Sequence, residues 1–283
     1  VKTDGNGRYV YLNPRRGGQI AVAEAARNVV CTGAKPMAIT NCLNFGNPYK
    51  PEAYWTFSEA VEGMGEACRT LNTPVTGGNV SLYNEHPEGA IFPTPVVGML
   101  GLIEDVQKHS TTPALKNEGD ALVYIGAPRR RLGGSEYLSL IHGLTTGDAP
   151  QLNLDFEARL QTGLLSAIKK GLVTAAHDIS DGGLAVTLAE MAIYGQKGLV
   201  MNATPLGSNL HEVLFSEAQS GVVVTVSPKL LETFKTLMEE SQIPVYHIGN
   251  VQGAELRINS GVNIPVEELS QLYENTIPQA MKL

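Results

Sequence analysis

The sequence predicts a two-domain protein of mixed class, part α+β and part α/β. Segments with helical spacing of apolar residues alternate with short apolar runs typical of strands, and they do so in both parts of the chain. The polar segment Val106–Gly119 separates these parts, so we expect one domain over residues 1–106 and a second over residues 107–283. A chain of 283 residues is long enough to give each domain its own core.

The first domain is expected to begin with a short strand, Arg8–Leu12, which the run Asn13–Gly18 breaks. An alanine-rich helix should follow over Gln19–Thr32 and stop at Gly33, with Arg27 inside its packing stripe. The remaining expected elements are a strand, an amphipathic helix and an almost continuously apolar strand: Pro36–Asn41, Glu52–Leu71 and Pro95–Ile103.

The second domain should alternate strands with helices in the same way. The expected strands are Ala121–Gly126, Val173–Ala176, Gly198–Met201, Val222–Val226, Val245–Gly249 and Glu255–Ile258. The expected helices are Ser135–His142, Phe156–Lys170, Gly183–Tyr194, Pro228–Ser241 and Val266–Asn275.

Bulk composition excludes several function classes. The net charge of −7 argues against a nucleic-acid-binding surface, which needs a basic patch. No apolar run approaches the roughly 18–20 residues of a membrane span. Cys31, Cys42 and Cys68 are scattered singly and are typical of reduced core thiols in a cytoplasmic protein. The chain opens at Val1 with neither an initiator Met nor a signal peptide, so we expect it to be a piece of a longer protein.

The most informative segment is Thr76–Ser81, which contains two adjacent glycines after a short apolar run. A Gly-Gly turn lets the backbone approach a ligand closely, with N–H groups free to face an anion. Asn79 and Ser81 add neutral oxygen atoms of the kind that Mg²⁺ accepts. A plain turn is the alternative interpretation.

Two further segments follow predicted strands. Thr40–Pro48 is rich in asparagine, and it lies where open α/β sheets bind ligands, although such residues also shape ordinary turns. His177–Leu184 places Asp178 and Asp181 beside a Gly pair that opens a helix, which suits either a Mg²⁺-phosphate group or simple helix capping. Glu217, in the polar run Ser216–Gly221, is a related candidate.

Other sequence features give weaker indications of function. The basic triplet Arg129–Arg131 is best explained as a solvated loop, and the remaining histidines have no metal-ligand spacing. The sequence contains no P-loop, nucleophile-elbow or dinucleotide-binding motif.

Taken in order, the motifs resemble the aminoimidazole ribonucleotide synthetase-like superfamily, and within it the family of phosphoribosylformylglycinamidine synthase synthetase subunits. Asp4–Gly7, Gly17–Gln19 and His177–Leu184 match the superfamily, whereas Leu43–Pro48 and Pro74–Ser81 are specific to that family. The resemblance covers the whole chain. It implies the second of two tandem copies, with a clipped start, in which an N-terminal sheet pairs with that of the first copy into a barrel and a C-terminal α/β domain follows.

The resemblance also implies a function and a set of site residues. Family members use ATP and Mg²⁺ to convert formylglycinamide ribonucleotide and glutamine-derived ammonia to the amidine in purine biosynthesis. By position, Asn41 and Gly78 match ATP contacts, Asn79 a metal ligand and Ser81 a substrate contact. The family's catalytic histidines and most metal-binding carboxylates belong to the first copy. Asp178, Asp181 and Glu217 therefore correspond to an auxiliary nucleotide site.

The implied partners are the N-terminal half of the same synthetase, a glutaminase subunit and a small accessory subunit, with neither nucleic acid nor membrane. Alone, the fragment should be inactive and should form a homodimer. Two alternatives remain: a non-catalytic scaffold half that keeps an auxiliary nucleotide site, or a related aminoimidazole ribonucleotide synthetase-like enzyme. The segment Leu43–Pro48 and the pair Asn79 and Ser81 disfavour the second alternative.

Overall fold

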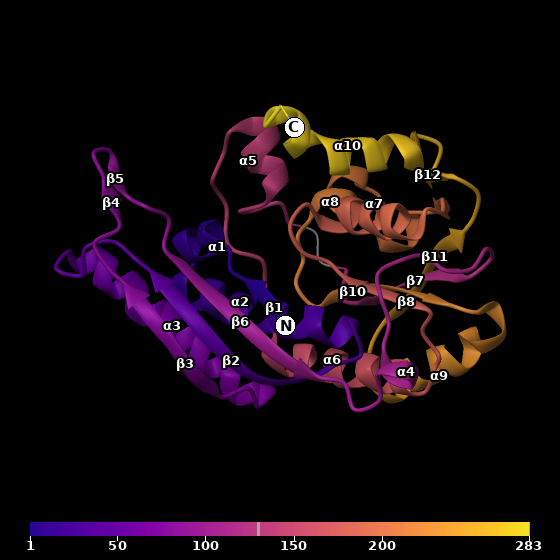
Figure 1. Cartoon of the computed structure of the whole chain (residues 1–283), viewed down its shortest axis with the longest axis horizontal. Coiled ribbons are helices and arrows are strands. Elements are labelled where there is room, and N and C mark those ends of the chain that lie inside the picture. The colour runs from indigo at the N-terminus through magenta and orange to yellow at the C-terminus, as the bar shows by residue number, and fades with distance from the viewer. Residues whose placement is uncertain (129–130, 283) are drawn as a thin grey trace.

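The computed structural model describes residues 1–128 and 131–282, so Arg129 and Arg130 of the basic triplet lie outside the described residues. Two sheets organise the chain, with their helices packed around them (Figure 1). We call the part up to Leu102 the N-terminal unit and the part from Ala121 onward the C-terminal unit. The predicted mixture of helices and sheets is confirmed.

The N-terminal unit is a four-stranded sheet in the order β1-β6-β2-β3, covered by helices on one face. Its strands and helices are β1 (Lys2–Asp4), α1 (Gly7–Leu12), α2 (Pro14–Cys31), β2 (Lys35–Asn44), α3 (Pro51–Leu71), β3 (Val75–Ser81) and β6 (Thr94–Leu102). A small hairpin, β4 (Glu85–His86) and β5 (Gly89–Ala90), projects at one end of the sheet (Figure 1).

The C-terminal unit is a seven-stranded sheet in the order β13-β12-β9-β11-β7-β10-β8, antiparallel except between β9 and β12. A short helix, α4 (Val106–His109), leads into it. Its strands are β7 (Ala121–Gly126), β8 (Ala175–Asp178), β9 (Leu199–Met201), β10 (Gly221–Val226), β11 (Val245–Val251), β12 (Glu255–Ile258) and β13 (Val262–Pro265). Its helices are α5 (Glu136–His142), α6 (Leu154–Lys169), α7 (Gly183–Gly195), α8 (Leu210–Phe215), α9 (Leu231–Glu240) and α10 (Val266–Ala280), with short 3₁₀ turns at Thr204–Leu206 and Pro228–Leu230.

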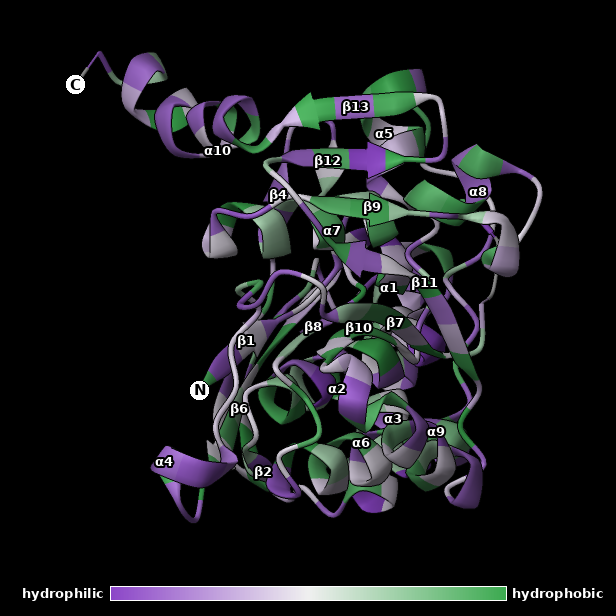
Figure 2. Ribbon diagram, turned by 90° about the vertical axis from the view of Figure 1, so that its right-hand side faces the viewer, coloured by the Kyte–Doolittle hydropathy of each residue, from purple (hydrophilic) through white to green (hydrophobic). Residues whose placement is uncertain are grey.

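Helices on both faces bury the middle of this second sheet. The alternate residues of β7 divide between two cores: Leu122 and Tyr124 pack with α7, whereas Val123 and Ile125 pack with α6 and α9. Every residue of β7 and β10 is buried, as expected for strands covered on both faces. The last helix, α10, extends away from the body of the molecule (Figure 2). In the described part of the chain, no helix combines the length and apolarity that crossing a membrane requires.

The prediction for Arg8–Leu12 was wrong, because this segment is a helix rather than a strand. The Asn6 side chain caps it by accepting hydrogen bonds from the backbone N–H groups of Arg8 and Tyr9. The predicted break at Asn13–Gly18 was also wrong, except at Asn13 itself. Asn13 caps α2, which starts at Pro14 and continues through the glycines.

Close helix packing explains the glycines inside α2. A Cβ atom on Gly18 would lie 2.3 Å from the carbonyl oxygen of Ala60 in α3, and one on Gly17 would lie 2.5 Å from the backbone nitrogen of Val10 in α1. These contacts leave no room for a side chain. The Gly pair therefore serves helix–helix contact inside α2 instead of forming a break between a strand and the helix.

The predicted Gly-Gly turn at Thr76–Ser81 was wrong as well, since these residues form most of strand β3. β3 pairs in parallel with β2, so the long helix α3 acts as a crossover connection between the two strands. Most other predicted elements occur with shifted ends. The short strands β1, β4, β5 and β13 and the short helices α4 and α8 were not predicted.

Candidate functional site

The four residues that the sequence predicts for ATP, metal and substrate all lie on the parallel pair β2 and β3. Asn41 is opposite Gly78, Cys42 opposite Asn79, and Asn44 opposite Ser81. β3 is the last strand of the sheet, so the backbone groups on its outer side have no partner strand in the described chain. The predicted residues therefore gather at one exposed edge.

The strand register divides these residues between the two faces of the sheet. Residues paired across strands share a face, and neighbours along a strand alternate. Asn41 is opposite the fully buried Val97 of β6, so it and Gly78 belong to the helix-covered face. Asn79 and Ser81 belong to the other face, which we call the open face because no helix in the described part of the chain covers it.

Gly78 and Asn41 fit together closely. A Cβ atom on Gly78 would lie 2.2 Å from Asn41 Oδ1 and 2.5 Å from the Asn41 carbonyl oxygen. Gly77, its neighbour, has nothing within 4 Å of the same position. The structure thus explains the second glycine of the pair by contact with the strand beside it.

Ser81 is held at the end of β3 by the loop that follows it. Its hydroxyl donates to Asn84 Oδ1 at 3.3 Å, and the Asn84 amide donates to the carbonyl oxygens of Ser81 and Phe45 at 2.9 and 3.0 Å. Asn79 differs, because its exposed side chain makes no hydrogen bond to any described residue. Its amide is therefore free to contact a ligand.

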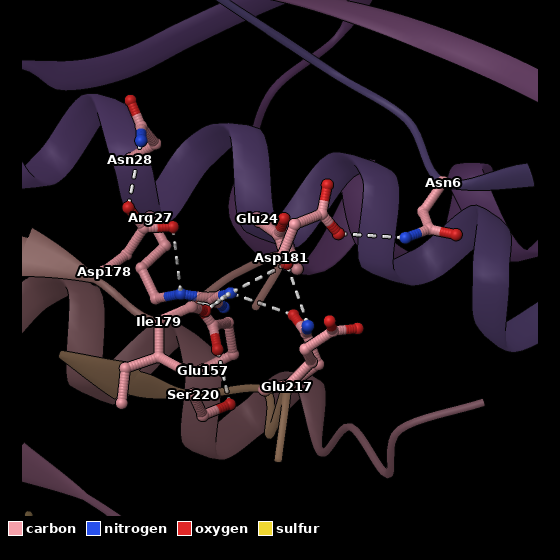
Figure 3. Close-up of polar contacts among 12 residues, drawn as sticks. Asn6, Glu24, Arg27, Asn28, Glu157, Asp178, Ile179, Asp181, Glu217 and Ser220 are labelled. Carbon is pink, nitrogen blue, oxygen red and sulfur yellow. Dashed lines mark hydrogen bonds and ion pairs between the residues drawn. The ribbon is translucent and has the colours of Figure 1, made fainter. Parts of the chain in front are cut away.

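The residues predicted for an auxiliary nucleotide site lie elsewhere, at the junction of the two units (Figure 3). Asp178 ends β8, Asp181 precedes α7, and Glu217 follows α8. Asp178 and Glu217 are each 1% exposed. Asp181 accepts a hydrogen bond at 3.0 Å from the side chain of Asn6 in the N-terminal unit. The structure brings the three together, with Asp178 and Glu217 in the protein interior and Asp181 exposed at its edge.

Glu217 occupies a position typical of a bound anion. One of its oxygens accepts backbone N–H groups of Glu136 and Gly182, both at 2.8 Å, where α5 and α7 begin. The other oxygen accepts the hydroxyl of the buried Tyr9. Because helix N-termini favour negative charge, this carboxylate satisfies two helix starts at once.

Arg27 supplies positive charge beside Asp178. It is fully buried, and its guanidinium donates to Glu157 at 3.0 Å, to Gln219 Oε1 at 2.9 Å and to Glu24 at 3.3 Å. Its Nε lies 3.9 Å from Asp178 Oδ2, and neither of these two atoms has a hydrogen-bond partner among the described residues. Asp178 Oδ1 accepts the side-chain amide of Asn28 at 2.9 Å.

Burial and neighbouring charges compete in setting the pKa values of this cluster. It raises the pKa of Asp4 to about 7, with repulsion from Asp178 adding to the effect, and raises the pKa of Glu217 to about 7. Burial opposes the charged form of His177, but hydrogen bonds with Asp178 and Glu190 outweigh it and raise the pKa to about 10. The pKa of Asp178 is lowered despite burial, because His177 and Arg27 stabilise its charge.

Sequence reasoning missed most members of this cluster. Glu24, Arg27 and Asn28 share one helix otherwise rich in alanine and valine, and polar residues within an apolar stripe were the available signal. Glu157 and Tyr9 gave no local signal, since Arg27 is 130 residues from Glu157 in sequence and Glu217 is 208 residues from Tyr9. Among the described residues, no group of three or more His, Cys, Asp or Glu side chains is arranged to hold a metal ion.

Comparison with protein-family models gives two adjacent matches. Residues 1–103 match the model described as AIR synthase related protein, N-terminal domain. Residues 117–259 match the model for the C-terminal domain of the same group. Together these matches cover most of the chain.

Curated relatives carry the name phosphoribosylformylglycinamidine synthase subunit PurL. The protein from Salinibacter ruber is 54% identical over 292 residues, which cover 99% of this chain and 38% of that protein. The protein from Symbiobacterium thermophilum is 49% identical over 300 residues, again 99% of this chain and 38% of the relative. The chain therefore spans less than half the length of the curated relatives that it matches.

Solved structures share the fold at low sequence identity. PurL of Thermotoga maritima in complex with FGAR superposes with a TM-score of 0.80 at 18% identity, covering 95% of this chain and 45% of that chain. The same protein in complex with ATP gives a TM-score of 0.72 at 19% identity, covering 95% and 44%. At such identity the likeness establishes the architecture alone.

Proposed function

Since this chain belongs to the family of AIR synthase related proteins, we propose that it is the second synthetase-like copy of a phosphoribosylformylglycinamidine synthase. The complete enzyme would convert formylglycinamide ribonucleotide, ATP and glutamine-derived ammonia to formylglycinamidine ribonucleotide, ADP and phosphate. The identity of 46–54% to curated PurL proteins over nearly the whole chain supports this proposal. We place the domain division at residues 106 and 107, between the two family-model matches.

The observation that carries the proposal is the open face of the N-terminal sheet, which holds Asn79 and Ser81. Leu100 and Leu102 of β6 are more than half exposed, whereas Val97 and Met99 on the helix-covered face are fully buried. An uncovered sheet face with apolar residues fits a missing partner layer. We propose that the sheet of the first copy covers it, with ATP and substrate bound near the junction.

The chemistry requires such closure. Phosphoryl transfer to a formamide oxygen develops negative charge, which Mg²⁺ and preorganised donors neutralise. The activated intermediate must also meet ammonia before it meets water. One open sheet face cannot exclude water, so this chain would contribute part of the site rather than a complete one.

The predicted residues on β2 and β3 could each supply one contact to ATP, Mg²⁺ or the substrate. Gly78 lies on an edge strand where backbone N–H groups can face a phosphate, with Asn41 packed directly beside it. Asn79 has a free amide oxygen and would hold Mg²⁺ together with groups from outside this chain. Ser81 would contact the ribonucleotide from the position that Asn84 fixes.

A second candidate function is that of a non-catalytic scaffold, in which this chain is a structural half of the synthetase. The contacts of the cluster around Asp178 favour this function. We propose Asp178, Asp181 and Glu217 as the border of the auxiliary nucleotide site that the family resemblance implies. Glu217 already accepts backbone N–H groups at the starts of α5 and α7, and Asp178 already lies beside Arg27. A nucleotide would have to replace those contacts. The internal contacts support a mainly structural role for this cluster.

Partners follow from the proposed reaction. The relatives are named as a subunit, and a solved structure of PurLQS from Thermotoga maritima shares this fold with a TM-score of 0.74. We propose the first synthetase copy, a glutaminase subunit and a small accessory subunit as partners. A purine-biosynthetic role and free cysteines support a cytoplasmic location.

A chimera tests the proposed function. The segment of Salinibacter ruber PurL that aligns with this chain is replaced by this chain, and ammonia-dependent turnover of formylglycinamide ribonucleotide with ATP is measured. We expect activity close to that of the parent, with Ser81→Ala raising the KM for the ribonucleotide. A folded chimera that binds ATP and forms no amidine would contradict the proposal.

A further inference from the structure

A buried group of polar contacts joins the two units at helix α2. This helix packs against β6 and α3 in its own unit and against α6 and β8 in the other. Glu24, Arg27 and Asn28 project from its side toward the C-terminal unit (Figure 3). These polar contacts cross from one unit to the other beside apolar ones, since Val30 and Cys31 of the same helix join a core of the C-terminal unit.

Arg27 lies at the centre of this group. Its guanidinium reaches α6 through Glu157, the turn after α8 through Gln219, and the end of β8 through the carbonyl oxygen of Ile179 at 3.4 Å. Among the described residues, Glu24 is the only one of its hydrogen-bond partners that lies on α2 itself. One side chain therefore bonds to three separate segments of the C-terminal unit.

Each partner of Arg27 is itself fixed by a further contact. Glu157 accepts the amide of Gln161 at 2.9 Å on one oxygen and the hydroxyl of Ser220 on the other. The Gln161 amide also donates to the carbonyl oxygen of Ala23 in α2 at 3.1 Å. The Gln219 amide donates back to Glu24 at 2.8 Å. The contacts thus cross the junction in both directions.

The shape and the burial of the Arg27 guanidinium favour one arrangement of the two units. A guanidinium presents its donors in a rigid planar fork, and a buried charge must keep its partners because water cannot replace them. Sliding or rotating the units would break several of these bonds together. We propose that Arg27 is a positioning residue that locks the N-terminal unit, with its site strands β2 and β3, at one fixed angle to the C-terminal unit.

The chain offers a matched comparison at the same junction. Arg16, also on α2, pairs with Asp148 of the C-terminal unit at 2.5 Å and donates to the carbonyl oxygen of Ala149 at 3.0 Å, but the side chains of Arg16 and Asp148 are 22% and 43% exposed. Water can replace this contact, and exposed ion pairs contribute little. Arg27→Met and Arg16→Met therefore remove the same charge from the same helix and differ in burial.

The experiment combines small-angle X-ray scattering with hydrogen exchange on the whole chain, with scattering recorded across each chromatographic peak. For Arg27→Met we expect a larger radius of gyration, with the amides of β2, β6, β7 and β10 keeping wild-type protection. At the junction, the amides of residues 179–183 and 216–220 should exchange at least about tenfold faster. Arg16→Met should match wild type in both measurements.

A further variant covers the case in which Arg27→Met fails to fold. Arg27→Lys keeps the charge and loses the fork, so it should fold and show the same junction opening to a smaller degree. Wild-type scattering and exchange in Arg27→Met would overturn the proposal. So would an unfolded Arg27→Met combined with an Arg27→Lys that cannot be distinguished from wild type, because the fork would then not be needed for positioning.

Discussion

Replacing Gly78 with alanine should separate β3 from β2 at the proposed ATP contact. The added methyl group would lie 2.2 Å from Asn41 Oδ1 and 2.5 Å from the Asn41 carbonyl oxygen. Comfortable contact needs roughly 3.5 Å, so both atoms are too close. The side-chain oxygen can rotate away, but the carbonyl oxygen is part of the strand pairing with Gly78. We expect the overlap to lower the free energy of unfolding by about 1–3 kcal/mol.

The neighbouring glycine provides the control. Gly77→Ala adds the same methyl group to the same strand, but nothing lies within 4 Å of it. Both substitutions reduce the freedom of the unfolded chain equally, so their difference measures the steric overlap together with the strain of an L-residue at the φ of +156° found at Gly78. We expect Gly77→Ala to stay within about 0.5 kcal/mol of wild type.

Urea denaturation of the three proteins, followed by circular dichroism, measures these differences. In the chimeric synthetase, Gly78→Ala should also raise the KM for ATP, since Asn41 would be displaced. Equal stability of the two variants, or greater damage from Gly77→Ala, would refute the packing argument and with it the explanation of this glycine.

Three further predictions follow from the site, the junction and the open face. Asn79→Leu in the chimera should melt normally and lower turnover by roughly 10²–10³, with partial rescue by excess Mg²⁺, whereas normal turnover at limiting Mg²⁺ would remove Asn79 from the site. The raised pKa of His177 means that the folded state holds this proton more tightly than the unfolded chain, so its stabilisation is complete below about 6.5 and is lost as pH rises through about 10. His177→Gln should therefore flatten the fall in melting temperature between pH 6.5 and 10, and an unchanged profile would show that another group titrates. The isolated chain should form a dimer through its open sheet face, and Leu100→Lys should weaken that dimer, so light scattering that gives a monomer at tens of micromolar would count against this pairing.

Sequence patterns predicted the long elements because burial imposes a period on them. α3 and α6 begin and end within two residues of their expected limits, and the apolar runs at β7 and β10 mark strands covered on both faces. The short segment Arg8–Leu12 was misread because alternating tyrosines imitate a strand, while the decisive contact is the cap from Asn6. Glycines were misread where they serve close packing, Gly18 as part of a break after a strand and Gly78 as part of a turn.

The two candidate clusters differ in how much of each could be predicted from the sequence. Asn41, Gly78, Asn79 and Ser81 lie on adjacent strands, so local motifs were enough to bring them together, although not to assign them to faces. The cluster around Arg27 depends on contacts between residues more than 100 positions apart. No local pattern encodes such distances, so only the packed structure could show that Glu157 and Gln219 meet Arg27.

Complementation in trans tests the central claim most directly. This chain is mixed with the separate N-terminal segment of Salinibacter ruber PurL, which supplies the proposed first copy, and ammonia-dependent formation of the amidine from formylglycinamide ribonucleotide and ATP is measured. The chain alone and the segment alone should show no turnover, and the mixture should be active once the two associate. Turnover by this chain alone at the rate of a complete synthetase, or a stable mixed complex that forms no amidine, would contradict the claim that it supplies one half of the active site.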